Sequence, residues 1–412
     1  MTDVLRRLPA HLIAEATELD RTDPLASFAD EFVQHPDVVA YLDGNSLGRP
    51  LTHTGERLSS FVDQEWGGRL IRAWDEQWFD QPLAIGDLLG RTVLGAAPGQ
   101  VVIGDSTTVM LYKLVRAAVA ARPDRTEIVA DTENFPTDRY IIDAVARETG
   151  LTVRWMTPDP AAGVTLADVQ AAVGPNTALV LLSHIAYKSA YIADLPTITA
   201  AAHDAGALVL WDLCHSVGAI EIDLDGTDVD LAVGCTYKYL NGGPGAPAFG
   251  YVASRLHDGL AQPITGWMGH ADPFAMGPDF QPAQGIRRLI SGTPPILGML
   301  PVRDMLEMID RATMAQVRAK SVRLTEFAVK VADAGLATHG VTVASPREAA
   351  IRGGHVTIEH DRMREVVAEL WTRGVIPDFR PPRGLRAGLS PLSTRFGEVA
   401  LAFAHVADVL SD

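Results

Sequence analysis

Residues 207–212 read Ala-Leu-Val-Leu-Trp-Asp, an apolar run that ends in one carboxylate. A helix-like segment, 195–205, precedes it, and Gly206 is placed to close that helix. Between about residues 90 and 300 similar runs alternate with helix-like segments; the other runs are 100–104, 128–130, 177–183, 231–234 and 248–253. This alternation predicts an α/β fold with a mainly parallel, doubly wound sheet. Ligands of such sheets bind at the carboxyl ends of the strands.

The sequence pattern changes after Pro301. We expect there one long helix, two strands and a second helix; their ranges are 305–334, 341–344, 355–359 and 362–372. The length of 412 residues also favours two domains. We therefore predict a large α/β domain over 66–300 and a smaller α+β domain over 301–412. The N-terminal segment 1–65 is expected to pack with the smaller domain.

Composition restricts the partners that the chain can have. Lysine and arginine total 35 against 51 acidic residues, a net charge of −16, so nucleic acid and anionic membranes are not expected partners. The two cysteines, Cys214 and Cys235, lie in apolar runs and predict neither a disulfide framework nor a metal site, which fits a reducing cytoplasm. No signal peptide is expected. The sequence contains no run of about 18 apolar residues, so no membrane-spanning helix is expected either.

Lys238 lies between an apolar run and a glycine-rich turn, in Cys235-Thr-Tyr-Lys-Tyr-Leu-Asn-Gly-Gly-Pro-Gly. Asp212 closes the strand quoted above. Pyridoxal phosphate needs an amine that holds it as a Schiff base and an acid that keeps its pyridine nitrogen protonated. Lys238 and Asp212 are the candidates for these two roles. Taken alone, a solvated lysine and a helix-capping aspartate explain the two residues equally well.

Further polar and aromatic residues follow the apolar runs. Thr107 and Thr108 open a predicted helix, where free backbone N–H groups either bind a phosphate or belong to an ordinary N-cap. Phe135 could stack on a flat cofactor and Asp138 could bond to its substituents, or the segment is a turn around a buried aromatic. His215 either lies against the cofactor or is a structural histidine.

Arg386 lies in the predicted small domain, bracketed by turn residues. Its planar guanidinium suits the capture of a substrate carboxylate by two parallel hydrogen bonds. A surface salt bridge is the alternative, and the nearby Arg383 shows how weak the signal of one arginine is.

Six segments together closely resemble the kynureninases, hydrolases of fold type I that use pyridoxal phosphate. The likeness extends from about residue 41 to 392 and is most specific in the segments around Lys238 and Trp267. The segments are Tyr41-Leu-Asp-Gly-Asn-Ser-Leu-Gly, Glu133-Asn-Phe-Pro-Thr-Asp-Arg-Tyr, Trp211-Asp-Leu-Cys-His-Ser-Val-Gly, Tyr237-Lys-Tyr-Leu-Asn-Gly-Gly-Pro-Gly-Ala-Pro, Gly266-Trp-Met-Gly-His and Gly292-Thr-Pro-Pro-Ile-Leu.

The resemblance implies a role for each matching residue. Lys238 would carry the cofactor, Asp212 would pair with its pyridine nitrogen, and Phe135 would stack on its ring. A homodimer with shared active sites is also implied, in which Trp267 and Thr293 reach the phosphate of the other subunit. The remaining residues implied around the cofactor are Thr107, Thr108 and Tyr237 at the phosphate, with Thr137, Asp138, Ser183 and His215.

The resemblance also implies a substrate site, in which Arg386 grips the α-carboxylate and Ser46 lies close by. Family members that prefer the 3-hydroxylated substrate resemble one another in a histidine, a serine and an asparagine, where this chain has Trp74, Gly292 and Thr293. A ring hydroxyl would then lack partners, which costs ~1–3 kcal/mol, so we expect L-kynurenine to be preferred over 3-hydroxykynurenine.

Three positions depart from the family pattern: Met110 and Ala186 stand where asparagine is usual, and Ala190 where glycine is common. Because of these three departures, one alternative is a member of the family that serves a biosynthetic pathway. A class V aminotransferase or cysteine desulfurase of the same fold is a second, and a binding protein that kept the cofactor site is a third. A desulfurase needs an accessible thiolate, which neither cysteine is expected to offer.

The activity implied by the resemblance is the hydrolysis of L-kynurenine to anthranilate and L-alanine in tryptophan degradation. Lys238 would act both as the tether of the cofactor and as the base that removes the α-proton. Tyr237 is the candidate for proton delivery, because it is the neighbour of Lys238 in the sequence.

Overall fold

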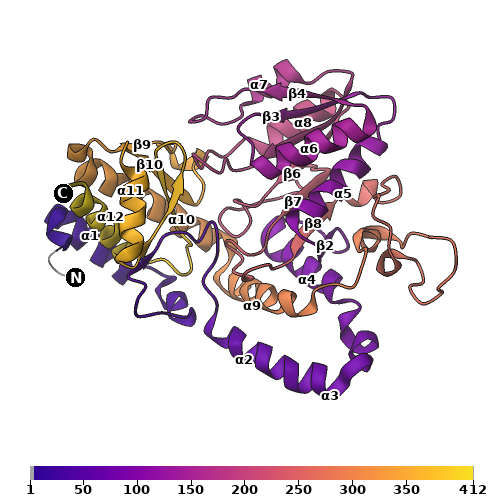
Figure 1. Cartoon of the computed structure of the whole chain (residues 1–412), viewed down its shortest axis with the longest axis horizontal. Coiled ribbons are helices and arrows are strands. Elements are labelled where there is room, and N and C mark those ends of the chain that lie inside the picture. Colours follow the sequence, from indigo (N-terminus) through magenta and orange to yellow (C-terminus); the bar gives the residue numbers. More distant parts are fainter. Residues whose placement is uncertain (1–3, 412) are drawn as a thin grey trace.

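The structure is a computed structural model and describes residues 4–411. Its centre is a seven-stranded sheet of strand order β2-β8-β7-β6-β5-β3-β4 (Figure 1). The strands from β7 to β4 are parallel, and β8 runs antiparallel to both of its neighbours, so the predicted α/β fold is confirmed. The strands are β2 (Val101–Gly104), β3 (Glu127–Asp131), β4 (Thr152–Met156), β5 (Thr177–Ser183), β6 (Leu208–Asp212), β7 (Leu231–Gly234) and β8 (Ala248–Val252).

Helices cover both faces of this sheet. Along β5, Leu179 and Leu181 pack into one core and Val180 and Leu182 into the other, which is why the strand reads as a continuous apolar run. Helices α5 and α6 contribute to the first core, and α4, α7 and α8 contribute to the second. The helices are α4 (Gln81–Leu89), α5 (Thr107–Ala120), α6 (Pro136–Thr149), α7 (Leu166–Ala172) and α8 (Leu195–Asp204).

The single helix predicted over 305–334 is wrong. Two helices, α9 (Ile296–Ala312) and α10 (Met314–Val331), meet at Thr313, whose φ of 64° breaks the helical path. The side chain of Thr313 instead caps α10 by accepting a hydrogen bond from Gln316 N. The predicted domain boundary at residue 300 falls inside α9, which packs against α4 and joins the core of the sheet.

A smaller lobe packs a four-stranded antiparallel sheet, of order β12-β13-β10-β9, against helices from both ends of the chain. Figure 1 shows the indigo N-terminal helix α1 (Ala10–Arg21) beside the yellow α12 (Phe396–Ser411), so α1 lies on this lobe. Strand β1 (Ala40–Tyr41) also pairs with β11 (Val375–Ile376). The remaining elements are β9 (Thr342–Val343), β10 (His355–Glu359), α11 (Met363–Thr372), β12 (Asp378–Arg380) and β13 (Gly384–Gly388).

Helix α2 (Thr52–Ser60) starts an arm that runs along α9 and away from the sheet (Figure 1). Large apolar side chains are exposed on the arm, with Trp66 52%, Leu70 58% and Ile71 78% accessible. Asp304 of α9 is fully buried beneath α2, where it accepts a hydrogen bond from Thr54 Oγ1 at 2.6 Å and pairs with Arg57. None of the helices in the described part of the chain is long and apolar enough to cross a membrane.

The contact beneath α2 gives a stability prediction. Asp304→Ala is expected to lower the free energy of unfolding by ~2–4 kcal/mol, because Thr54 and Arg57 lose a buried partner. Glu307→Ala is the matched control, since Glu307 is an exposed partner of the same arginine, and its loss should cost less than ~0.5 kcal/mol. Urea unfolding followed by tryptophan fluorescence measures both, and equal losses would contradict the prediction.

Candidate active site

A cavity of about 80 Å³ lies at the carboxyl edge of the large sheet. Strands β5 and β6 end there at Ser183 and Asp212, and the chain that follows β7 brings in Lys238. Parallel strands end at one edge, so residues far apart in the sequence meet. The lining residues are Thr107, Thr108, Phe135, Thr137, Asp138, Ser183, Tyr187, Asp212, Cys214, His215, Tyr237 and Lys238.

The structure thus gathers the cofactor residues expected from the sequence, with the exception of Trp267 and Thr293. Sequence reasoning missed Tyr187, whose ring meets the ring of Phe135 edge-on with centroids 5.4 Å apart. It also missed Cys214 as a lining residue. Both stand two to four residues beyond a strand end, which is a positional signal for this edge of the sheet.

Lys238 is 9% exposed, and its Nζ lies 2.8 Å from His215 Nε2. Burial, followed by the nearby charge of Lys238, lowers the pKa of His215 well below its ordinary value. The imidazole is therefore neutral, and its Nε2 is hydrogen-bonded to the lysine amine. Lys238 Nζ also lies 5.8 Å from the centre of the Phe135 ring.

Two carboxyl groups share the cavity. Asp212 Oδ1 accepts a hydrogen bond from Cys214 N at 2.9 Å, and its Oδ2 lies 3.2 Å from the Ser183 hydroxyl. Burial and the neighbouring Asp212 raise the pKa of Asp138 well above its ordinary value, which favours the protonated form of this carboxyl group. Asp138 Oδ2 is buried and has no hydrogen-bond partner within residues 4–411. This oxygen is available to a ligand of the cavity.

The third feature is the start of α5. Ser106 is its N-cap, because Ser106 Oγ accepts a hydrogen bond from Val109 N. The backbone N–H groups of the first helical turn have no partner inside the helix. Thr107 and Thr108 belong to that turn and line the cavity, so amides, hydroxyls and the helix dipole favour an anion there.

These residues fit pyridoxal phosphate. The cavity offers a primary amine, a carboxylate, an aromatic ring and a helix N-terminus for the phosphate. Asp138 Oδ2 and His215 Nδ1, which have no hydrogen-bond partner among residues 4–411, leave polar groups for the substituents of the ring.

Arg386 lies beside this cavity, in the middle of β13, and its side chain is 1% exposed. Turn residues at 381–383 and 391–393 bracket this strand, as expected, but the alternative of a surface salt bridge is wrong. Arg386 Nη1 donates to Tyr187 O at 2.8 Å, and its Nη2 donates to Ser46 Oγ at 2.8 Å and to Asp378 Oδ2 at 2.6 Å. Arg386 and Ser46 are therefore in contact.

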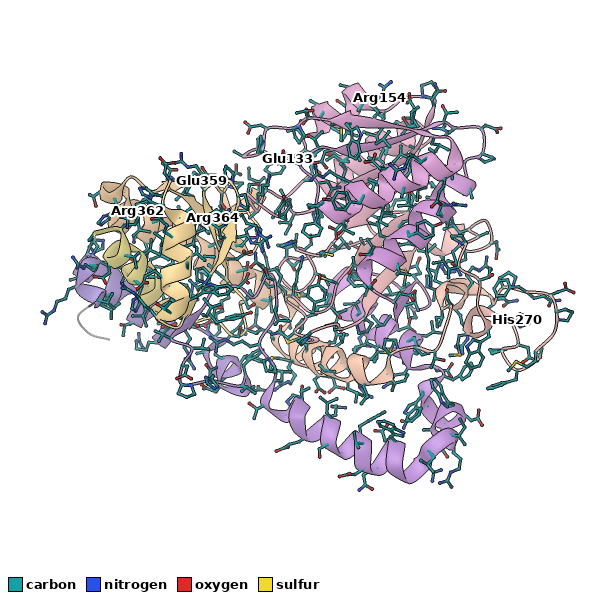
Figure 2. All side chains as sticks on the ribbon, viewed as in Figure 1. Glu133, Arg154, His270, Glu359, Arg362 and Arg364 are labelled. Carbon is teal, nitrogen blue, oxygen red and sulfur yellow. The ribbon has the colours of Figure 1, made fainter. Side chains whose placement is uncertain are left out.

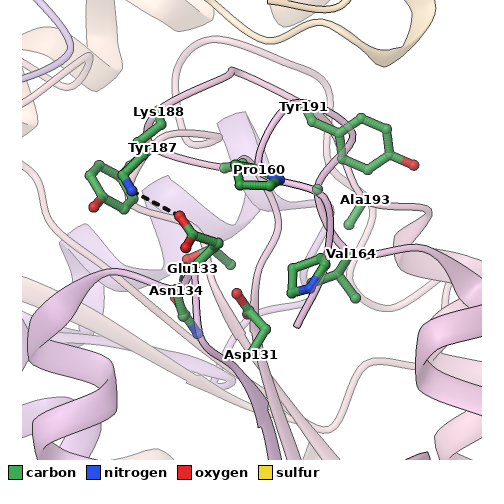
Figure 3. A pocket seen from close by; sticks show the side chains of 13 residues that line it. Asp131, Glu133, Asn134, Pro160, Val164, Tyr187, Lys188, Tyr191 and Ala193 are labelled. Atoms are coloured by element: carbon green, nitrogen blue, oxygen red, sulfur yellow. Dashed lines mark hydrogen bonds and ion pairs between the residues drawn. The ribbon is translucent and has the colours of Figure 1, made fainter. Parts of the chain in front are cut away.

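The two lobes meet at the loop after β5. Thr357 of the small lobe donates its hydroxyl proton to Lys188 O at 2.5 Å. Figure 2 shows Glu133 on the side of the large lobe that faces the small lobe, on which Glu359, Arg362 and Arg364 lie. A second cavity, of about 30 Å³, adjoins the first at Ser183 and Tyr187, which line both. In Figure 3, Lys188 reaches Glu133 in this cavity, with a distance of 2.8 Å from Nζ to Oε2.

Four residues expected at the site lie away from the cavity of Lys238 within one chain. Trp267 is 41% exposed, and Trp74 packs edge-on against Trp78. Gly292 and Thr293 line a different cavity, of about 340 Å³, together with Met110.

The two alanines that depart from the family pattern lie near the site. Ala186 lines the smaller cavity of Figure 3. Ala190 has a φ of 68°, in the left-handed region that favours glycine. The backbone therefore keeps the conformation for which glycine is common at this position.

Comparisons with known proteins agree with this geometry. The family of the kynureninase C-terminal domain matches residues 317–406, and the Cys/Met metabolism PLP-dependent enzyme family matches residues 104–268. Among solved structures, a C-DES mutant with glycine covalently linked to the PLP cofactor has a TM-score of 0.79 at 20% identity and covers 90% of this chain and 96% of its own. An apo cysteine desulfurase from Thermococcus onnurineus NA1 has a TM-score of 0.77 at 17% identity and covers 96% and 98%. These two likenesses concern the fold, which is fold type I.

Curated relatives are much closer in sequence. A kynureninase of Pseudomonas fluorescens is 40% identical over 400 residues, which make up 95% of this chain and 94% of the relative. A kynureninase of Burkholderia pseudomallei strain 1106a is 41% identical over 402 residues, 96% of this chain and 95% of the relative. With such identity over nearly the whole length, and with the amine, carboxylate and helix N-terminus gathered in one cavity, this chain belongs to the kynureninase family of pyridoxal phosphate enzymes.

Proposed function

We propose that this protein hydrolyses L-kynurenine to anthranilate and L-alanine with pyridoxal phosphate, and that it prefers L-kynurenine to 3-hydroxykynurenine. The observation that carries the proposal is the buried Lys238 amine beside a neutral His215, in one cavity with Asp212. The bound cofactor supplies an electron sink for the bonds that break at the substrate.

Lys238 is proposed both to hold the cofactor and to take the α-proton. Its amine is hydrogen-bonded to the neutral His215 Nε2 at 2.8 Å, and this contact holds the lysine in place within the cavity. Asp212 lies in the same cavity and is proposed to pair with the pyridine nitrogen.

Arg386 and Ser46 are proposed to bind the substrate carboxylate. The guanidinium is buried beside the cavity, where water competes little with a carboxylate. Its contact with Tyr187 O ties its position to the wall of the cavity, because Tyr187 also lines that cavity.

Tyr237 is proposed to deliver a proton during cleavage of the Cβ–Cγ bond. It lines the cavity next to Lys238. Burial raises the pKa of Tyr237 above its ordinary value, so the phenol keeps its proton at neutral pH and remains a donor.

A homodimer with shared active sites is proposed from the exposed apolar surface. The arm exposes Trp66, Leu70 and Ile71, and the segment around Trp267 exposes Phe274 and Met276. Apolar side chains gathered in this way typically mark a surface that another chain covers. In such a dimer Trp267 and Thr293 would complete the phosphate site of the second subunit, and Trp74 and Gly292 would line its ring pocket.

The activity of a cysteine desulfurase has less support. It requires an accessible thiolate, but Cys214 and Cys235 are both buried. A hydrogen bond to Cys235, together with burial, raises the pKa of Cys214 well above its ordinary value. Two free buried thiols fit the proposed cytoplasmic location.

The activity and the ring preference are tested together by incubating cofactor-loaded protein with each kynurenine and identifying the products. We expect anthranilate and L-alanine, without amino transfer to a keto acid. The kcat/KM should be at least ~5-fold higher for L-kynurenine, because Gly292 has no side chain that could hydrogen-bond to a ring hydroxyl. A preference for 3-hydroxykynurenine would instead favour a biosynthetic enzyme.

The role of Tyr237 predicts a selective loss in Tyr237→Phe. We expect kcat to fall about a hundredfold with little change in KM, since the ring stays and only the proton donor is removed. Tyr239→Phe is the matched control, because the Tyr239 hydroxyl is buried without a hydrogen-bond partner among the described residues. Undiminished turnover in Tyr237→Phe would remove Tyr237 from this role.

Shared active sites predict complementation between two inactive variants. In the proposed dimer each site takes Lys238 from one subunit and Trp267 from the other. A dimer of one Lys238→Ala subunit and one Trp267→Ala subunit therefore has both changes in one site and neither change in the other. Subunit exchange at equal amounts should restore about a quarter of the wild-type activity, since about half of the dimers are mixed. Mixtures that stay inactive, with exchange verified by mass spectrometry, would place every site within one chain.

A further inference from the structure

Two arginines and an aspartate project from one face of the small sheet. Strands β12 and β13 are antiparallel, and Asp378 lies directly opposite Arg386. Alternate residues of a strand share a face, so Arg380 lies on the same side as Asp378, while Phe379 between them packs toward the core of the small lobe. The shared face is the one on which Arg386 reaches Tyr187 of the cofactor cavity.

The hydrogen-bond donors of Arg386 are almost all in use. Its Nη2 donates to both Ser46 Oγ and Asp378 Oδ2, and its Nη1 donates to Tyr187 O. The amide of Asn45, turned so that its oxygen faces the guanidinium, accepts from Nε at 2.9 Å. Of the five N–H groups of an arginine, one on Nη1 remains.

This pattern restricts how a substrate carboxylate can bind. A carboxylate bound by two parallel hydrogen bonds uses either Nε with Nη2 or Nη1 with Nη2. Both edges include Nη2, whose two hydrogens are already engaged by Ser46 and Asp378. The substrate must therefore displace one of them, and Asp378 presents the same functional group as the substrate.

Arg380 is a second ion-pair partner for Asp378. Its Nη2 lies 2.7 Å from the same oxygen, Asp378 Oδ2, that Arg386 holds. Its Nε, on the same edge of the guanidinium, is buried and has no hydrogen-bond partner in the described part of the chain. A small rotation of Asp378 would complete a two-bond pair with Arg380, so no buried charge is left without a counter-ion.

We propose that Asp378 and Arg380 form a carboxylate exchange that determines substrate specificity. Asp378 occupies Arg386 in the substrate-free protein, and it passes to Arg380 when the α-carboxylate of the substrate takes its place. The proposal rests on the proposed role of Arg386. A ligand without a carboxylate does not displace Asp378, so the exchange selects amino acids over the corresponding amines.

The two partners of the exchange predict opposite changes in KM. Asp378→Asn removes the charge of the internal competitor, so the KM for L-kynurenine should fall about three- to tenfold. Arg380→Gln removes the guanidinium to which Asp378 would move, so the KM for L-kynurenine should rise by about the same factor. In both variants kcat should stay within about twofold, because neither residue touches the reacting atoms.

Arg383→Gln is the matched control. Arg383 lies on the same hairpin but pairs with Glu359 and Asp361 at the surface, so its KM should not change. Inhibition by L-alanine and by ethylamine gives a second measurement on the cofactor-loaded protein. Asp378→Asn should bind L-alanine more tightly and leave ethylamine unchanged, an effect that a general loss of structure does not produce.

The outcomes separate this inference from the proposed function. If Arg386→Gln leaves KM unchanged, Arg386 does not bind the carboxylate and both ideas fail. If Arg386→Gln raises KM while Asp378→Asn and Arg380→Gln change it in the same direction, only the exchange is overturned. Should Asp378→Asn not fold, a KM of Arg380→Gln equal to that of the wild type overturns the exchange by itself.

Discussion

The contact between Lys238 Nζ and His215 Nε2 is the interaction around which the site is organised. A buried amine needs a partner, and a neutral imidazole satisfies it without adding a charge. Burial keeps His215 neutral, and the small lobe contributes to it, because the ring of His355 in β10 meets the His215 ring edge-on with centroids 5.6 Å apart. The strand ends, the helix N-terminus of α5 and the loop with Lys238 are useful chemically because they converge on this one buried place.

The relative position of the two lobes fixes the second half of the site. Arg386 belongs to the small lobe but donates to the carbonyl of Tyr187, and Thr357 of the same sheet donates to Lys188 O. One loop of the large lobe therefore sets the distance between the proposed carboxylate site and the cavity of Lys238. The positive φ of Ala190 at the end of this loop shows that its backbone path is kept without glycine.

Most of the large sheet could be predicted because strands buried on both faces read as apolar runs. Strand β4 was missed, since it lies at the edge of the sheet and alternates exposed and partly buried side chains. The break at Thr313 was also missed, because the apolar spacing continues from α9 into α10 and only the backbone dihedral angles separate them. The short strand β13, which carries Arg386, was missed because the glycines and prolines around it hid its pattern.

The sequence by itself determined the α/β architecture, the kinds of side chain at the site and the resemblance to a family. These follow from local patterns, since apolar spacing and the order of residues after a strand are properties of neighbours in the chain. Only the tertiary structure decided which side chains meet. The burial of Arg386, its engagement with Asp378, the neutral state of His215 and the absence of Trp267 and Thr293 from the lining of the Lys238 cavity depend on contacts between distant segments. Burial and electrostatic environment are sums over all neighbours in space, and no local pattern contains them.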